Sequence, residues 1–278
     1  MSWVAVARKD FRDAIRSRMF WALAIVFGLL SVGLGAAFGY YSDQFIESVP
    51  GNQLGVGLVS FVQSPITIFI MFVSAIICHK SIVGEWEQGS LKLLLSLPHT
   101  RLEVITGKIV GRSAVLAVPA IASLVIGLGV GGALLGTVPI VLSVEFLVAI
   151  LVYIVLYVSI FVGLSAVTRS SSLAVAGAIV LIVVQFFWGA IAAVLTIVLD
   201  LSGDADWLYI YQSLTPNGAF NEVLSATLAA TTEWPAATVR ANNVDAVYAT
   251  PVLAALILLL WFVVPVALGY WRFSNADL

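Results

Sequence analysis

Residues 80–101 read KSIVGEWEQGSLKLLLSLPHTR, and this charged stretch lies between two segments too apolar to belong anywhere but a lipid bilayer. Together with the next eleven residues, it holds five of the chain's thirteen basic side chains: Lys80, Lys92, Arg101, Lys108 and Arg112. A polar connection of this length between two membrane spans can form a folded element of its own. The rest of the chain is arranged around it.

The first half of this stretch has the pattern of a helix end. Residues 82–88 can continue the preceding membrane helix into water, and Gly89 suits the left-handed conformation that ends a helix at little steric cost. Ser90 can cap the next helical turn. The sequence therefore predicts a helix that breaks at Gly89.

The second half predicts a short amphipathic helix and then the start of the next membrane helix. Leu91, Leu94 and Leu95 fall on one face at i, i+3, i+4 spacing, and a proline shortly afterwards stops the helix. Thr100 and Glu103 then form the T-x-x-E pattern of a capping box. We expect that capping box to open the helix that enters the third span.

Two interpretations of this loop compete. It can be an interfacial hairpin that merely joins two spans. It can instead be a docking surface for a cytoplasmic partner, because exposed Glu85, Trp86 and Glu87 beside a leucine face supply charge and a large aromatic anchor, a mixture favoured at interface hot spots. Spacing alone does not choose between the two.

A family resemblance favours the docking surface. Residues 84–98, GEWEQGSLKLLLSLP, followed by a basic residue at 101 and Gly-Lys at 107–108, resemble the cytoplasmic loop of ABC-2-type transporter permeases. The most similar variety is the permease of the nitrous-oxide-reductase maturation, or copper-processing, system. Trp86 falls at a variable position of the pattern, and its role as an anchor is inferred from its size. The resemblance implies these ATPase-coupling residues: Gly84, Glu85, Glu87, Gly89 and Ser90.

Composition places the whole chain in the membrane. Hydrophobic residues make up 61% and charged residues 10% of the 278, and the mean hydropathy is +1.08. A soluble domain would carry about a quarter charged residues. A net charge of −2 gives no indication of nucleic-acid binding, and the single cysteine, Cys78, permits no internal disulfide.

Apolar runs of about twenty residues predict six membrane spans, at residues 19–41, 55–78, 113–136, 144–167, 173–199 and 250–271. The fold class is therefore an all-α integral membrane protein, which we expect to form a single ABC-2-type transmembrane domain over residues 1–278. Residues 79–112 form its cytoplasmic coupling loop and residues 200–249 its external loop. With both termini in the cytoplasm, twelve basic residues lie inside and only Arg240 outside, as the positive-inside rule requires.

Residues 1–18 predict a basic amphipathic helix lying in the headgroup plane. Trp3, Ala7, Phe11 and Ala14 repeat at helical spacing on one side. The other side carries Arg8, Lys9, Arg12, Asp13 and Arg16. The alternative is a positively charged flank that only orients the first span.

Three G-x-x-x-G patterns, at residues 35–39, 127–131 and 132–136, predict close helix packing, with a dimer seam as one possible use. Polar side chains within the spans are candidates for a transport pathway. They are Gln63, Ser64 and Thr67 in the second span and Gln185 in the fifth. Interhelical hydrogen bonding is the other explanation for these polar groups.

Residues 213–220, SLTPNGAF, resemble the P-x-x-A-[FY] stretch that these permeases carry before their last span. The resemblance implies a helical pair in this region. The long polar loop around it could instead form a small external cap.

The chain has no phosphate-cradling G-x-x-x-x-G-K-[ST] loop, so we expect ATP and Mg²⁺ to bind a separate ATPase subunit and no cofactor to bind this chain. Cys78, His79 and His99 lack metal-ligand spacing, and no metal site is predicted. The predicted function is a non-enzymatic ABC permease subunit of the cell membrane, working as a homodimer or pseudo-dimer in the lipid bilayer. The alternatives are a non-transporting, force-transmitting anchor and an ATP-independent secondary transporter.

Overall fold

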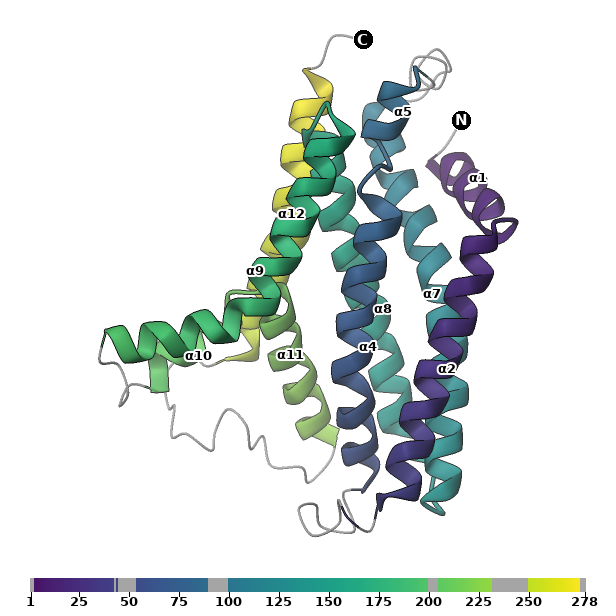
Figure 1. Ribbon diagram of the computed structural model, residues 1–278, viewed down its shortest axis with the longest axis vertical. Coiled ribbons are helices and arrows are strands. Elements are labelled where there is room, and N and C mark those ends of the chain that lie inside the picture. Colours follow the sequence, from purple (N-terminus) through teal and green to yellow (C-terminus); the bar gives the residue numbers. More distant parts are fainter. Residues whose placement is uncertain are drawn as a thin grey trace. The chain divides into compact units, whose positions relative to one another are not determined.

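The computed structural model describes residues 3–42, 44, 54–89, 100–199, 205–231 and 250–275 (Figure 1). All regular secondary structure within these residues is helical. The helices are α1 (Trp3–Ile15), α2 (Arg18–Tyr40), α4 (Leu54–Cys78), α5 (Val83–Glu87), α7 (Arg101–Leu134), α8 (Ile140–Val167), α9 (Ser171–Val198), α10 (Ala205–Ser213), α11 (Pro216–Thr231) and α12 (Pro251–Ser274).

Six helices are long and apolar enough to cross a membrane, which confirms the predicted number of spans. They are α2, α4 with its extension into α5, α7, α8, α9 and α12. The largest difference in bounds is at α7, which begins at Arg101 rather than near residue 113. The predicted capping box explains this early start. The Glu103 N–H donates to Thr100 Oγ1 (3.2 Å), and the Thr100 N–H donates to the Glu103 carboxylate (2.9 Å).

The chain divides into two compact units. The first comprises Met1–Ala178 and Val264–Leu278, and the second comprises Ile179–Val263. The predicted single transmembrane domain stays a prediction.

In the first unit, α2 and α7 pack through glycines. A Cβ atom at Gly35 would lie 2.0 Å from the backbone oxygen of Gly127, and one at Gly127 would lie 2.4 Å from the backbone oxygen of Ser31. Small residues let helices approach closely in a membrane, where hydrophobic burial gives no drive to associate. Glycines at positions 35 and 127 thus form a seam inside the chain.

Helix α8 is the buried centre of this unit and packs against α4 and α7 (Figure 1). Tyr153 and Tyr157, with ring centroids 4.7 Å apart, are 1% and 0% exposed. The Tyr153 side chain is hydrogen-bonded to Thr67 of α4. This bond satisfies a phenol that would be costly to bury unpaired.

In the second unit, α10 and α11 form a helical pair, as the family resemblance implied. Thr215 caps α11, because its hydroxyl accepts the Gly218 N–H at 2.9 Å. The Trp188 ring stacks on Tyr211 with centroids 4.3 Å apart, and its Nε1 donates to the Tyr211 carbonyl at 2.8 Å. These contacts hold α10 on α9. Residues 200–204 and 232–249 of the predicted external loop lie outside the described residues.

Candidate functional site

The start of α5 is fixed by a serine from another helix. The Ser165 hydroxyl of α8 accepts the N–H groups of Ile82 (3.1 Å) and Val83 (3.2 Å), and Ser165 is fully buried. Because these two N–H groups bond to Ser165, the chain turns at residues 79–82 instead of running on as one helix from α4. Residues 83–87 are helical, in line with the predicted extension of the membrane helix into water, and they follow this turn.

The end of α5 agrees with the sequence. Gly89 has φ +71°, a left-handed conformation that a side chain would strain, so the predicted break at Gly89 is confirmed. Residues 90–99 lie outside the described residues. The roles assigned there to Ser90, Leu91, Leu94 and Leu95 stay predictions.

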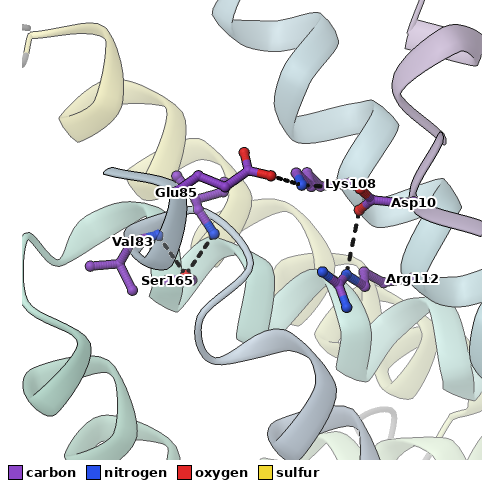
Figure 2. Close-up of polar contacts among 7 residues, drawn as sticks. Asp10, Val83, Glu85, Lys108, Arg112 and Ser165 are labelled. Carbon is purple, nitrogen blue, oxygen red and sulfur yellow. Dashed lines mark hydrogen bonds and ion pairs between the residues drawn. The ribbon is translucent and has the colours of Figure 1, made fainter. Parts of the chain in front are cut away.

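Four charged side chains from three helices meet beside α5 (Figure 2). Lys108 Nζ of α7 lies 2.5 Å from Glu85 Oε1 of α5 and 3.1 Å from Asp10 Oδ1 of α1. Arg112 Nε, one turn along α7, lies 3.4 Å from Asp10 Oδ2. We call these four residues the charge junction.

Burial makes the charge junction energetically important. The Lys108 side chain is 2% exposed and Asp10 is 7% exposed, whereas Glu85 and Arg112 are 24% and 29% exposed. Two positive charges face two negative ones, so the cluster is neutral, and the loss of any single member leaves a net charge. Removing one partner of a buried ion pair leaves an uncompensated charge and costs about 3–5 kcal/mol.

Two glycines of α7 bring α1 close enough for Asp10 to reach Lys108. A Cβ atom at Gly107 would lie 2.7 Å from Val6 Cβ, and one at Gly111 would lie 3.1 Å from the Ala7 carbonyl oxygen. Any larger residue at these positions would push α1 outward. The pattern G-K-x-x-G therefore places a lysine beside a helix-packing surface.

A helix, α1, is present where the N-terminal helix was predicted, and its buried residues only partly coincide with the predicted apolar face. Val6 and Ala7 are buried, whereas Trp3 is 43% exposed. The reason is that α1 packs on α7 through Gly107, which turns Val6 and Asp10 inward. A position of α1 at the headgroup plane stays a prediction.

Glu85 and Trp86 are not the exposed pair that was expected. Glu85 is half-buried and bonded to Lys108. Trp86 is also half-buried, with its ring centroid 6.4 Å from that of Phe273 and 5.8 Å from the guanidinium carbon of Arg169. Both residues thus contact other helices. Their roles in coupling remain untested predictions.

Glu87 is exposed, as expected. Its carboxylate accepts the Ser171 N–H at 2.7 Å and also the Ser171 hydroxyl. These hydrogen bonds hold the pKa of Glu87 below its usual range. The contact joins the end of α5 to the start of α9, within the first unit.

The four pathway candidates occupy different environments. Thr67 is 2% exposed, and its hydroxyl donates to the carbonyls of Gln63 and Ser64 at 3.0 Å each. Ser64 is exposed. Gln185 belongs to the second unit. Thr67 is therefore packed within the bundle, and a pathway role for these residues stays a prediction.

Among the described residues, no third metal-ligating side chain joins Cys78 and His79. Cys78 is fully buried, and His79 Nδ1 lies 3.0 Å from the Ala75 carbonyl oxygen. Within the described part of the chain, no group of three or more His, Cys, Asp or Glu side chains has the arrangement of a metal site.

Sequence reasoning missed Asp10, Ser165 and the burial of Lys108. A signal for Lys108 was present, because it stands between glycines spaced four apart on a predicted helix. Asp10 had a weaker signal, as an acidic residue among the basic residues of α1. Ser165, a single serine in an apolar span, gave none.

Comparison with known proteins places this chain in a family. Residues 4–278 match the family described as ABC-2 family transporter protein. The chain is 32% identical over 142 residues to the "Probable ABC transporter permease protein NosY" of Pseudomonas aeruginosa, covering 50% of this chain and 47% of that protein. It is 31% identical over 137 residues to the protein of the same name from Stutzerimonas stutzeri, covering 47% of this chain and 48% of that protein.

The chain thus matches about half the length of these curated relatives. The resemblance noted in the loop at residues 84–98 is confirmed by the family match, which extends over nearly the whole sequence. Six apolar helices agree with that family's place in the bilayer. The chain therefore belongs to the ABC-2 transporter family and is a multi-pass protein of the cell membrane.

Proposed function

We propose that this chain is the permease subunit of an ABC transporter and that it moves a substrate across the cell membrane with energy from a separate ATPase subunit. The observation that carries the proposal is the bond between Glu85, from the loop that resembles the family's coupling loop, and the buried Lys108. That bond continues to Asp10. A push on α5 is therefore delivered to α7 and α1 together.

The energetics support force transmission over a passive connection. Moving α5 alone would separate Glu85 from Lys108, which is 2% exposed and has little access to water. Because separating buried charges is unfavourable, a joint movement of α5, α7 and α1 costs less free energy than a movement of α5 alone. Conformational coupling between sites is typically worth about 1–3 kcal/mol, a range that one such ion pair can supply.

The exposed end of α5 is the part of the described chain best suited to receive the ATPase. Glu87 presents its carboxylate at the surface. The neighbouring Trp86 ring contacts Phe273 and Arg169, and these contacts support the end of α5. The Trp86–Phe273 contact joins α5 to the end of α12, and both would face the cytoplasm in the proposed orientation. ATP and Mg²⁺ would bind the ATPase, and two permeases would assemble around one substrate pathway.

The proposal is tested by separating docking from transmission. The permease is purified with its ATPase, and two quantities are measured: the yield of co-purified ATPase and the permease-dependent stimulation of ATP hydrolysis. For Glu85→Gln we expect normal co-purification and a loss of stimulation of about tenfold, since one coupling contact is weakened. For Glu87→Lys we expect reduced co-purification.

Glu145→Gln serves as the matched control, because Glu145 lies near the start of α8, away from the charge junction. It should retain both quantities. Failure of the wild-type permease to bind any ATPase would overturn the proposed function. Full stimulation in Glu85→Gln would overturn the role of the charge junction.

A further inference from the structure

A cavity of about 360 Å³ lies beside the charge junction. It is bounded by α1, the first turns of α2, the ends of α4 and α5, and α7. Its size falls within the range of small-molecule sites. Since one wall is the N-terminal helix and another is a membrane span, the cavity adjoins the predicted boundary between lipid and water.

The cavity has two chemically distinct sides. Its apolar side is lined by Met19, Phe20 and Leu23 of α2, with Ile77 and Val115. Its charged side is lined by Lys9, Asp10, Asp13, Glu85, Lys108 and Arg112. Three positive and three negative side chains therefore face one space beside an apolar wall.

Some of these charges remain available to a ligand. Lys108 is occupied by Asp10 and Glu85. Lys9 and Asp13 are exposed, and neither has an ion-pair partner in the part of the chain that the structure describes. Arg112 lines the cavity and meets Asp10 through Nε, so this contact does not use the N–H groups of its two terminal nitrogens. The available groups are thus two cations and one carboxylate.

We propose that this cavity binds a phospholipid whose headgroup carries both a phosphate and a primary amine, as in phosphatidylethanolamine. The phosphate would meet Arg112 and Lys9, and the amine would meet Asp13. The first part of the acyl chains would lie against Met19 and Leu23. Lipid recognition by basic pockets between membrane helices is physically well founded, and the carboxylates add selectivity for the amine.

Charge complementarity decides between headgroups. A purely anionic headgroup would bring its charge beside Asp10, Asp13 and Glu85, and like charges at close range are unfavourable. A choline headgroup has no N–H to donate to a carboxylate, and its recognition usually requires several aromatic faces. Phe20 is the one aromatic side chain in the lining. A primary amine therefore fits better than either alternative.

The test uses the purified full-length permease without ATPase, so its outcome is independent of the proposed coupling. Retention of phosphatidylethanolamine, phosphatidylcholine and phosphatidylglycerol with identical acyl chains is measured by native mass spectrometry. We expect phosphatidylethanolamine to bind about tenfold more tightly than the others, the effect of one charge-assisted hydrogen bond. Free phosphoethanolamine, which lacks the acyl chains, should compete only weakly.

Two variants locate the site. Leu23→Trp should fill the cavity and weaken binding of phosphatidylethanolamine by about tenfold or more, while Leu29→Trp, at a 72% exposed position of the same helix, should bind normally. Asp13→Asn should abolish the preference for phosphatidylethanolamine over phosphatidylglycerol, while Arg12→Gln, one residue away and outside the lining, should keep it.

Each variant is first shown to melt at the wild-type temperature without added lipid. If Leu23→Trp fails this check, Asp13→Asn on the helix surface decides the matter. Equal binding of phosphatidylcholine or phosphatidylglycerol to the wild type would overturn the proposal. So would unchanged selectivity in Asp13→Asn, or free phosphoethanolamine binding as tightly as the lipid.

Discussion

The two halves of α7 pack against different helices with the same glycine spacing but different chemistry. Gly107 and Gly111 admit α1, and Lys108 between them is held by charges from two other helices. Gly127 admits α2, Gly131 meets both α2 and Leu58 of α4, and their closest contacts are backbone and apolar atoms. The comparison indicates that glycine spacing sets how close helices come, whereas buried charge decides which helices must move together.

The largest expected effect on stability concerns the charged half of α7, around Lys108. Lys108→Ala leaves Asp10 and Glu85 in a site with little water, and it should lower the free energy of unfolding by about 3–5 kcal/mol. Unfolding of the detergent-purified protein by heat or denaturant measures this. The combined variant Glu85→Gln/Lys108→Met should recover most of the loss, because Asp10 still faces Arg112 and the cluster stays neutral. If Lys108→Ala has the same free energy of unfolding as the wild type, the buried charges contribute nothing to the stability of the fold.

The second largest effect on stability concerns the uncharged half of α7, where it packs against α2. Gly35→Ala places a methyl group 2.0 Å from the Gly127 backbone oxygen, so α2 and α7 must separate, at a cost of about 1–3 kcal/mol. The matched control is Gly33→Ala on the same helix, which meets no atom within 4 Å. It should be neutral or slightly stabilising, because alanine favours a helix over glycine. Equal melting temperatures for the two variants would mean that the seam is looser than described.

The smallest effect tests how α1 is held. Gly107→Ala brings a methyl group within 2.7 Å of Val6 Cβ, which should loosen α1 while leaving the α2–α7 seam intact. Tryptic cleavage after Arg8 and Arg12 should accelerate, by about tenfold for each 1.4 kcal/mol of lost packing. Gly129→Ala, which meets no atom within 4 Å, should leave the cleavage rate unchanged. An unchanged rate in Gly107→Ala would show that α1 is not held by this contact.

Local sequence patterns predicted much of the fold. Six apolar runs gave the six spans, Thr100 and Glu103 gave the capping box, and Gly89 gave the left-handed break. Each of these signals lies within a few residues of the feature that it produces. The family resemblance in residues 84–98 likewise depended on a contiguous stretch.

The charge junction could not be predicted in the same way. Lys108 is 98 positions from Asp10 and 23 from Glu85, and Ser165 is 82 positions from Val83. Such pairings depend on which helices pack together, and a single sequence without its tertiary packing does not specify that. Glu85 looked like an exposed carboxylate because its partner lies on another helix.

The most direct measurement is a set of spin-label distances in the complex with the ATPase. Labels are placed at exposed Gln88, at the end of α5, and at exposed Arg12 on α1, and the fully buried Cys78 should take no label. If the charge junction joins these helices, the distance between the labels stays the same in the nucleotide-free and ATP-trapped states, and it changes in Glu85→Gln. A wild-type distance that changes between the two states would show that α5 moves without α1, and it would contradict transmission through Lys108.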